Sequence, residues 1–304
     1  MLSLDVVVRT LADVQRSGLL FRALDSIQNQ SGVSARPIVV VNGDRYDPDT
    51  MAELERRPDI LLHRLCQASA RLALAEGRRL VTAGYFSYLD DDDVLIANSL
   101  QEPVKWLESH PDCDVLISNG YFVKEGDTLS ELIRIDDHIK VAQPALSLLD
   151  DSWLQPGAFI FRTKSIPPNM TASSWDYMEW THLAYKICAA EKRVNFINVP
   201  TVRYYNTPGS RSKDAAYEEA AIDLMQLIRS DSRMSPEVRA KADKKYHVAL
   251  HILAAKYAGE GDLRRAWRCH LASMHPPYTL DYLLFSRKLL WSARRRGKKT
   301  AHSI

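Results

Sequence analysis

The sequence has few of the residues that build small cross-linked domains. Its 304 residues include only Cys66, Cys113, Cys188 and Cys269, and no two of them form a C-x-x-C pair. Disulfide scaffolds and zinc ribbons need closely spaced cysteines, so both classes are excluded and a reducing compartment is expected. With 12 glycines and 14 prolines, the chain is also neither collagen-like nor of low complexity.

Long apolar runs are missing as well. No stretch reaches the roughly 18 uncharged apolar residues that a membrane-spanning helix needs. The first nine residues have no basic start and predict a strand entering a core, not a targeting segment. Hydrophobic residues make up 46% and charged residues 26% of the chain, as in globular enzymes. We therefore expect a cytoplasmic protein.

Charge is nearly balanced overall but not along the chain. The formal net charge is +2, yet the segment from residue 287 to the C-terminus carries seven basic side chains and no acidic one, so residues 1–286 carry −5. An acidic body argues against a nucleic-acid partner. The stretch 282–299 mixes apolar and basic residues. This stretch could lie on an anionic membrane surface, which would be the inner face of the cytoplasmic membrane. The alternative is a helix that packs on the body of the protein.

Strand and helix patterns alternate through the first 120 residues. This alternation predicts an α/β fold with a mostly parallel sheet flanked by helices. Ligands of such sheets bind beyond the carboxyl ends of the strands. The expected strands are 5–9, 37–41, 84–89 and 114–118, and the expected helices are 20–27, 69–80 and 97–109.

The pattern changes near residues 120 and 214. We expect a domain over residues 1–213, with a nucleotide-binding half at 1–118 and an acceptor-side half at 119–213, followed by a helical C-terminal region at 214–304. The acceptor-side half reads as a hairpin at 121–139, strands at 158–162 and 194–199, and a helix at 177–190; the C-terminal helices are expected near 215–230, 236–258, 262–273 and 279–296. Oligomeric state cannot be read from these patterns.

Four consecutive aspartates, Asp90 to Asp93, follow the predicted strand 84–89. Four neighbouring carboxylates cannot all be buried in ionised form without a cation. Hard oxygen ligands suit Mg²⁺ or Mn²⁺, which also bridge substrate phosphates. The alternative is a solvated acidic turn that caps the helix expected from Ala97. A prenyl-transfer D-D-x-x-D motif fails at Val94, and residues 9–14 contain no glycine-rich nucleotide loop.

His247 and His251 have the i, i+4 spacing of a zinc pair on a predicted helix. The glutamate of an H-E-x-x-H motif is absent, and no third ligand stands nearby. We expect ordinary histidines on a helix surface.

Several segments resemble the family 2 glycosyltransferases in sequence and order. The resemblance implies a GT-A fold over about residues 4–212, a nucleotide-diphospho-sugar donor, and inversion at the anomeric carbon. The family's second strand normally ends in two aspartates, where Val41 and Asn42 stand here. This departure leaves the base open, with uracil expected. The matching segments are 5–10, 20–31, 37–44, 70–71 and 84–93.

Matched by position, the family's D-x-D motif falls on Asp90 and Asp92. The resemblance implies that Asp92 is the direct metal ligand and that Asp90 faces the ribose or an ordered water. Residues 203–212 resemble a loop that reaches the diphosphate in the family, and Arg71 matches an arginine of its A-R-N segment. The expected nucleotide-contacting residues are Thr10, Asn42, Asp44, Arg71, Asp90, Asp91 and Arg211.

Inversion needs a carboxylate to take the proton of the acceptor hydroxyl. In the family this base belongs to an E-D pair at a helix start, and the matching stretch here is 175–187. The alignment puts Glu179 on the E and Trp180 on the D. Glu179 is the first candidate for the base and Asp176 the second. Either could instead be a carboxylate that favours the N-terminus of a helix.

These observations predict a metal-dependent inverting glycosyltransferase of the hexosyltransferase type. It would move a sugar from a UDP-linked donor to a hydroxyl of a glycan or lipid-linked acceptor. The resemblance to the family implies that this step belongs to bacterial surface polysaccharide biosynthesis. A sugar nucleotidyltransferase would need a glycine-rich loop after its first strand. A non-catalytic scaffold or binding protein with a degenerate transferase domain remains the alternative, favoured by Asn42 and Trp180.

Overall fold

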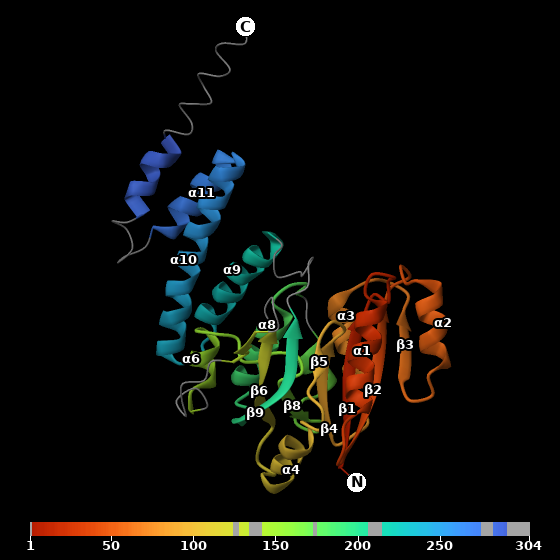
Figure 1. Cartoon of the computed structure of the whole chain (residues 1–304). Coiled ribbons are helices and arrows are strands. Elements are labelled where there is room, and N and C mark those ends of the chain that lie inside the picture. Colours follow the sequence, from red (N-terminus) through yellow and green to blue (C-terminus); the bar gives the residue numbers. More distant parts are fainter. Residues whose placement is uncertain are drawn as a thin grey trace. The chain divides into compact units, whose positions relative to one another are not determined.

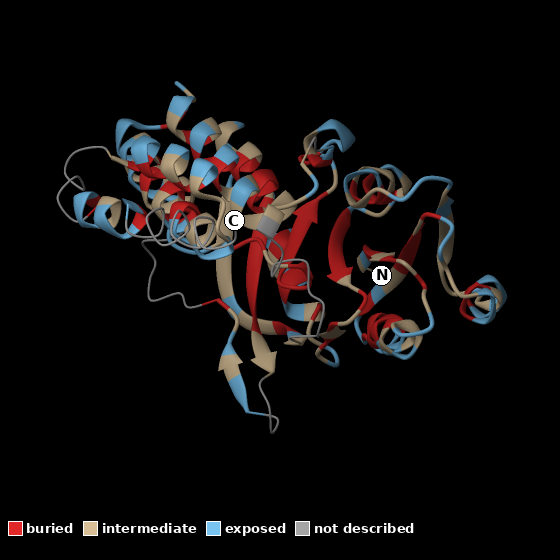
Figure 2. Ribbon diagram, turned by 90° about the horizontal axis from the view of Figure 1, so that it is seen from above, coloured by how far each residue is buried: buried red, intermediate tan, exposed pale blue. Residues whose placement is uncertain are grey.

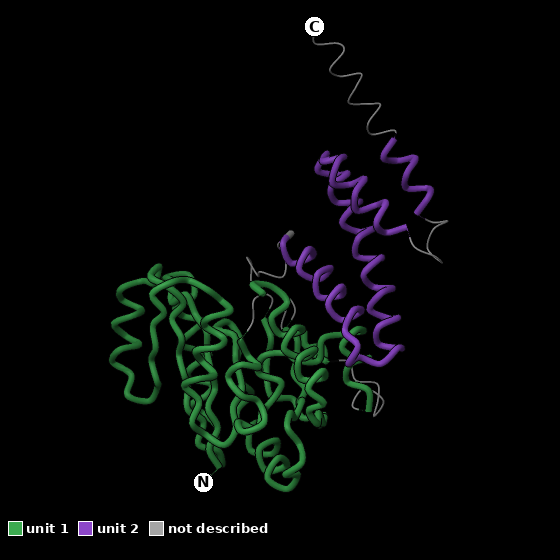
Figure 3. Tube along the Cα trace, turned by 180° about the vertical axis from the view of Figure 1, so that it is seen from behind, with its two compact units in different colours: residues 1–210 green, residues 211–304 purple. Residues whose placement is uncertain are grey.

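The chain divides into two compact units, residues 1–210 and 211–304 (Figure 3). The expected boundary at residues 213 and 214, and Arg211 with it, lies outside the described residues. The computed structural model describes residues 2–123, 128–133, 142–172, 175–205, 215–274 and 282–290.

The first four strands of unit 1 lie side by side and parallel. Their order is β3-β2-β1-β4 (Figure 1). Valine runs in β1 and β2 are fully buried, as expected of strands covered on both faces. Figure 2 shows these buried strands between helices whose outer faces are exposed. The bounds are β1 (Leu2–Thr10), β2 (Val33–Asn42), β3 (Leu61–Leu65) and β4 (Tyr85–Asp90).

The connecting helices begin at polar caps. Asp47 accepts a hydrogen bond from the Thr50 amide at 2.8 Å, and Ser69 accepts one from the Leu72 amide at 3.3 Å. Such caps satisfy amides that a helix start leaves unpaired. The helices are α1 (Ser17–Gln28), α2 (Pro48–Arg56) and α3 (Ala70–Leu80); α1 packs on β2, and α3 packs on β1 and β2.

The sheet continues beyond β4 in mixed orientation. Strand β8 runs antiparallel to both β4 and β6, whereas β6 and β9 are parallel. Strand β6 crosses the expected division at residues 118 and 119. The order is β4-β8-β6-β9-β5, with β7 paired to β6, and the bounds are β5 (Val94–Leu95), β6 (Val115–Val123), β7 (Leu129–Glu131), β8 (Phe159–Arg162) and β9 (Val194–Tyr205). Helices α4 (Gln101–Ser109), α6 (Pro144–Leu148), α7 (Pro168–Thr171) and α8 (Glu179–Ala189) complete the described part of unit 1.

The segment after the aspartates differs from the expectation. The helix predicted at 97–109 begins only at Gln101, and its cap residue, Leu100, makes no side-chain cap bond. The aspartates lead instead into β5, which pairs antiparallel with β9. This pairing extends β9 to Tyr205, beyond the predicted 194–199. The capping interpretation of the acidic run is therefore wrong.

The described residues of unit 2 form helices joined by short turns. Helix α10 packs against both α9 and α11. His251 stacks on Tyr282, with ring centroids 3.8 Å apart, and His247 is 6% exposed. The expectation of surface histidines is wrong, because neighbouring helical segments cover α10. The bounds are α9 (Ala215–Ser230), α10 (Pro236–Glu260) and α11 (Leu263–Ser273), and residues 282–290 are also helical. Of the helices described, none combines the length and apolar character needed to cross a bilayer.

Gly157 permits a close contact between the β8 segment and the end of β4. Its φ is +78°, and an added Cβ would lie 2.6 Å from Val202 Cγ2 and 3.1 Å from Leu89 Cδ1. We predict that Gly157→Ala lowers the free energy of unfolding by about 2 kcal/mol or more. Gly18→Ala is the control, since nothing lies within 4 Å there and alanine favours a helix. Urea denaturation of both variants checks this, and equal midpoints would contradict it.

Candidate functional site

Three of the expected nucleotide-contacting residues lie at one edge of the sheet. Thr10 and Asn42 end the neighbouring parallel strands β1 and β2, and Asp44 is exposed in the turn that follows. Thr10 Oγ1 accepts a hydrogen bond from the Ala12 amide at 2.9 Å. Asn42 Oδ1 accepts one from the Ser69 amide at 2.6 Å, which ties β2 to the start of α3. The edge is the carboxyl end of the strands, where ligands bind in open α/β sheets.

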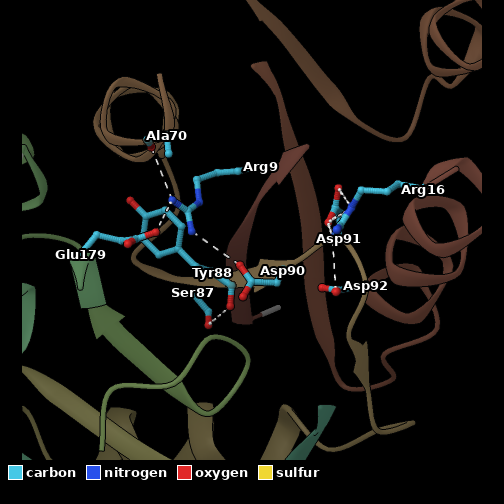
Figure 4. Close-up of polar contacts among 9 residues, drawn as sticks. All are labelled: Arg9, Arg16, Ala70, Ser87, Tyr88, Asp90, Asp91, Asp92 and Glu179. Atoms are coloured by element: carbon cyan, nitrogen blue, oxygen red, sulfur yellow. Dashed lines mark hydrogen bonds and ion pairs between the residues drawn. The ribbon is translucent and has the colours of Figure 1, made fainter. Parts of the chain in front are cut away.

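The aspartate run at this edge is divided between two arginines (Figure 4). Asp90 lies 3.6 Å from Arg9 Nη2. Asp91 pairs with the Arg16 guanidinium through both carboxylate oxygens, and Asp92 Oδ2 lies 3.2 Å from Arg16 Nη2. Strand β4 ends at Asp90, and Asp91 and Asp92 lie in the turn that follows, so the split between the two arginines falls where the strand ends. The chain thus supplies part of the positive charge that the run requires.

Burial raises the pKa of two carboxyl groups of the run, those of Asp90 and Asp93, to different extents. Burial raises the pKa of Asp90 to about 6; Arg9 opposes this shift, and the charges of Asp92, Asp91 and Glu179 add to it. Burial, reinforced by the charge of Asp90, raises the pKa of Asp93 to about 9. Asp93 is therefore neutral at pH 7.

Asp93 and the main chain beside it join the acidic turn to the end of β9. The Tyr205 amide donates to Asp93 Oδ1 at 2.9 Å, and the side chain of Asp93 is fully buried. Arg22 donates to the Asp92 carbonyl at 2.9 Å, and its Cζ lies 4.4 Å from the centre of the Tyr205 ring. Asp93 therefore has a structural role, because it ties the acidic turn to the end of β9. The segment after Tyr205, with Arg211, lies outside the described residues.

Glu179, the first candidate for the base, is the first residue of α8. Its side chain is 16% exposed, and Oε1 lies 3.3 Å from Arg9 Nη1. The preceding residue, Met178, has φ 57° and makes no side-chain cap bond. Glu179 therefore shares Arg9 with Asp90, so the structure brings the expected base and the first residue of the D-x-D motif to one guanidinium.

Asp176 and Arg71 lie apart from this contact. Their side chains are 60% and 44% exposed, and Asp176 Oδ1 is 4.0 Å from Arg71 Nε. Trp180, at the family's aspartate position, packs against Tyr88 and Phe159, with ring centroids 5.1 Å and 5.6 Å apart. The tryptophan thus extends the aromatic core instead of providing an acidic group.

The donor groups at this edge fit a divalent cation in their chemistry. Carboxylate oxygens of Asp90 and Asp92 are hard ligands, and the Asp90 side chain is 33% exposed. In the part of the chain that the structure describes, no three His, Cys, Asp or Glu side chains are arranged to hold a metal. Mg²⁺ commonly uses only one or two protein carboxylates and completes its shell with water and substrate phosphates. The set therefore fits a cation that binds together with a diphosphate.

Sequence reasoning places Arg9 with the aspartates at the carboxyl ends of the strands but gives it no role, and it misses Arg16 and Arg22 as members of this site. A signal was present, since four adjacent carboxylates at a buried strand end need cations. Arg9 also interrupts an otherwise apolar strand. The partner of each aspartate could not be assigned, because the contacts join residues more than 60 positions apart.

No family model and no curated protein matches the chain. Solved structures of S. aureus TarS are similar in fold. TarS 1–349 in complex with UDP-GlcNAc aligns with TM-score 0.59 and 14% identity over 82% of this chain and 72% of that chain. TarS 1–349 with UDP gives 0.55 and 14% over 82% and 71%, and TarS itself gives 0.53 and 15% over 84% and 44%. The expected fold class is confirmed: a GT-A-like, mostly parallel sheet flanked by helices, with a helical C-terminal part.

The buried carboxyl of Asp93 makes stability depend on pH. Its pKa is about 9 in the folded chain and about 4 when unfolded, so the folded state holds a proton that the unfolded state releases. Stability is therefore fully present below about pH 4 and falls toward pH 9, by up to about 1.4 kcal/mol per pH unit.

Asp93→Asn should flatten this dependence, because the amide still accepts from Tyr205 but does not titrate. Urea midpoints of wild type and variant from pH 5 to pH 9 measure the difference. Parallel profiles would show that Asp93 is ionised in the folded protein.

Proposed function

We propose that the chain is a nucleotide-sugar glycosyltransferase of the inverting, metal-dependent kind found in family 2. The observation that carries the proposal is the contact of Arg9 with both Glu179 and Asp90 at the carboxyl edge of a GT-A-like sheet. An acidic group for proton transfer and an acidic run for a cation and diphosphate thus occur together. Fold alone does not specify chemistry, so the proposal rests on this site.

The donor in this proposal is a UDP-linked hexose. Support comes from the shared fold with TarS structures that hold UDP-GlcNAc and UDP. Thr10, Asn42 and Asp44 would contact the nucleoside, and Asp90 and Asp92 would hold Mn²⁺ or Mg²⁺. A bound divalent ion would neutralise the leaving diphosphate, an effect worth several kcal/mol. The other nucleotide-contacting residues proposed are Asp91, Arg71 and Arg211.

Glu179 acts as the general base in this mechanism. Its carboxylate accepts the proton of the acceptor hydroxyl while that oxygen forms a bond to the anomeric carbon. The bond from the anomeric carbon to the phosphate oxygen breaks, and the nucleoside diphosphate departs with the electron pair. The configuration inverts because attack and departure occur on opposite faces, with no covalent enzyme intermediate.

The acceptor would be a glycan or lipid-linked hydroxyl of bacterial surface polysaccharide synthesis. A lipid-linked acceptor agrees with a cytoplasmic protein held at the inner membrane face by its basic C-terminal segment. On the described helix 282–290, Leu283, Leu284 and Leu290 are 47%, 64% and 56% exposed, and Arg287 and Lys288 are also exposed. Apolar and basic side chains on one exposed surface are typical of interfacial helices.

A second candidate is a non-catalytic scaffold or binding protein. Packing of Trp180 against Tyr88 favours it, because the family has an aspartate at this position. Incubation with a panel of nucleotide sugars, with and without Mn²⁺, distinguishes the two functions. Release of a nucleoside diphosphate supports the transferase. No release, and no thermal stabilisation by UDP with Mn²⁺, would support the scaffold.

Asp92→Asn should reduce UDP release at least about 100-fold, because the variant loses a charged ligand of the proposed cation. Asp112→Asn is the control, since Asp112 is 81% exposed and pairs with Arg193. Initial rates at saturating Mn²⁺ measure both. Equal rates for Asp92→Asn and wild type would remove Asp92 from the metal site.

Glu179→Gln should lower kcat by about 100-fold or more while leaving UDP affinity within a factor of three, since only the proton acceptor is lost. Asp176→Asn is the control, because Asp176 lies three positions earlier and is exposed. It should change kcat less than twofold. Steady-state rates and UDP titrations separate the two parameters. An exchange of the two results would show that the alignment has slipped and that Asp176 is the base.

A further inference from the structure

Arg9 occupies a position in unit 1 that no sequence motif assigned. It is the second-last residue of β1, and its side chain is 14% exposed. Nη1 lies 3.3 Å from Glu179 Oε1 and 3.4 Å from the Ala70 carbonyl, and Nη2 lies 3.6 Å from Asp90. Figure 4 shows the guanidinium between Glu179 and Asp90. One side chain thus connects β4, the start of α3 and the start of α8.

A guanidinium suits this position better than an ammonium. It presents several N–H donors in a fixed plane, so a single side chain can contact separate oxygens at once. Its Cζ also lies 5.1 Å from the centre of the Trp180 ring. The aromatic face therefore restricts the plane of the guanidinium, and through it the direction in which Nη1 reaches Glu179.

The contact leaves one oxygen of Glu179 for chemistry. Arg9 binds Oε1, and Oε2 accepts no hydrogen bond from any described residue. Among the described residues, Arg9 is the group that holds this carboxylate.

A purely structural ion pair is the competing explanation. Buried ion pairs add little net stability, because desolvation offsets the attraction between the charges. The Arg36–Asp5 pair shows such a role elsewhere on the sheet. Arg36 Nε donates to Asp5 Oδ1 at 2.9 Å, near the start of β1. Asp5 also accepts hydrogen bonds from the amides of Thr82 and Ala83. This pair therefore joins β1 and β2 to the segment before β4 and involves no residue of the proposed site. Arg9 differs because both of its carboxylates belong to the proposed site.

We infer that Arg9 is a positioning residue for the general base. Arg9 holds the Glu179 carboxylate so that Oε2 faces the acceptor hydroxyl. It also sets the distance between Glu179 and Asp90, and so aligns the proton acceptor with the aspartates that would bind the donor. This inference rests on the proposed function. Arg9 itself exchanges no proton in the reaction.

A double-mutant cycle with Arg9→Gln and Glu179→Gln tests the inference. Arg9→Gln should lower kcat between 10- and 100-fold, because the base loses its orientation, and should change the donor KM less than threefold, because Asp90 and Asp92 keep their carboxylates for the proposed cation. In the Glu179→Gln background, Arg9→Gln should change kcat less than twofold, because no base remains to be oriented. Arg9→Lys should recover part of the loss, since it keeps the charge but not the planar geometry.

Arg36→Gln is the matched control for a structural ion pair. It should lower the urea midpoint without changing kcat. Independent, multiplying effects of Arg9→Gln and Glu179→Gln would overturn the inference, and so would an Arg9→Gln effect confined to KM. If Arg9→Gln does not fold, the cycle is run with Arg9→Lys, whose kcat loss must likewise disappear in the Glu179→Gln background.

The wild-type chain separates this inference from the proposed function. If wild type releases UDP from a donor and Arg9→Gln retains full kcat, only the positioning role is lost. If wild type releases no nucleoside diphosphate from any donor, the transferase function fails, and the role of Arg9 fails with it.

Discussion

The architecture of the candidate site depends on how four adjacent carboxyl groups are accommodated at the end of a buried strand. Arg9 contacts Asp90, Arg16 contacts Asp91 and Asp92, and Asp93 is accommodated in its neutral form. Arg9 lies in β1 and Arg16 is the cap residue of α1, so the first strand and the start of the following helix supply the charge that the end of β4 needs. The same arrangement leaves Asp90 between a protein cation and the proposed metal ion. A site of this kind can bind a diphosphate with its cation without first creating an uncompensated cluster of charge.

The fold was largely predictable because its signals are local. Continuous valine runs in β1 and β2 and the capping residues Asp47 and Ser69 mark the parallel part of the sheet and its helices. The mixed part was less predictable. Strand β5 has only two residues, too few for a periodic pattern, and it exists because β9 pairs with it. The burial of His247 and the stacking of His251 on Tyr282 likewise depend on helical segments that follow α10 in the sequence.

The site could be predicted in part. Sequence reasoning located the acidic run and Glu179, because each belongs to a short motif. It located the edge of the sheet from the alternation of strand and helix patterns. Which carboxylate meets which arginine depends on the twist of the sheet and on the direction of each side chain, and the sequence specifies neither directly. The roles assigned to these residues stay predictions. The structure adds that Glu179 and Asp176 lie in different environments, one beside Arg9 and the other beside Arg71 at the surface.

The bond between the Tyr205 amide and Asp93 spans 112 positions in the chain. A ribosome releases the aspartates long before it releases β9, and contacts of large sequence separation form slowly. During synthesis, Asp93 therefore lacks its amide partner until the whole of the sheet domain has emerged. The acidic corner at the end of β4 is one of the last parts of the α/β unit to take its native form, so an incompletely made chain would lack an assembled site.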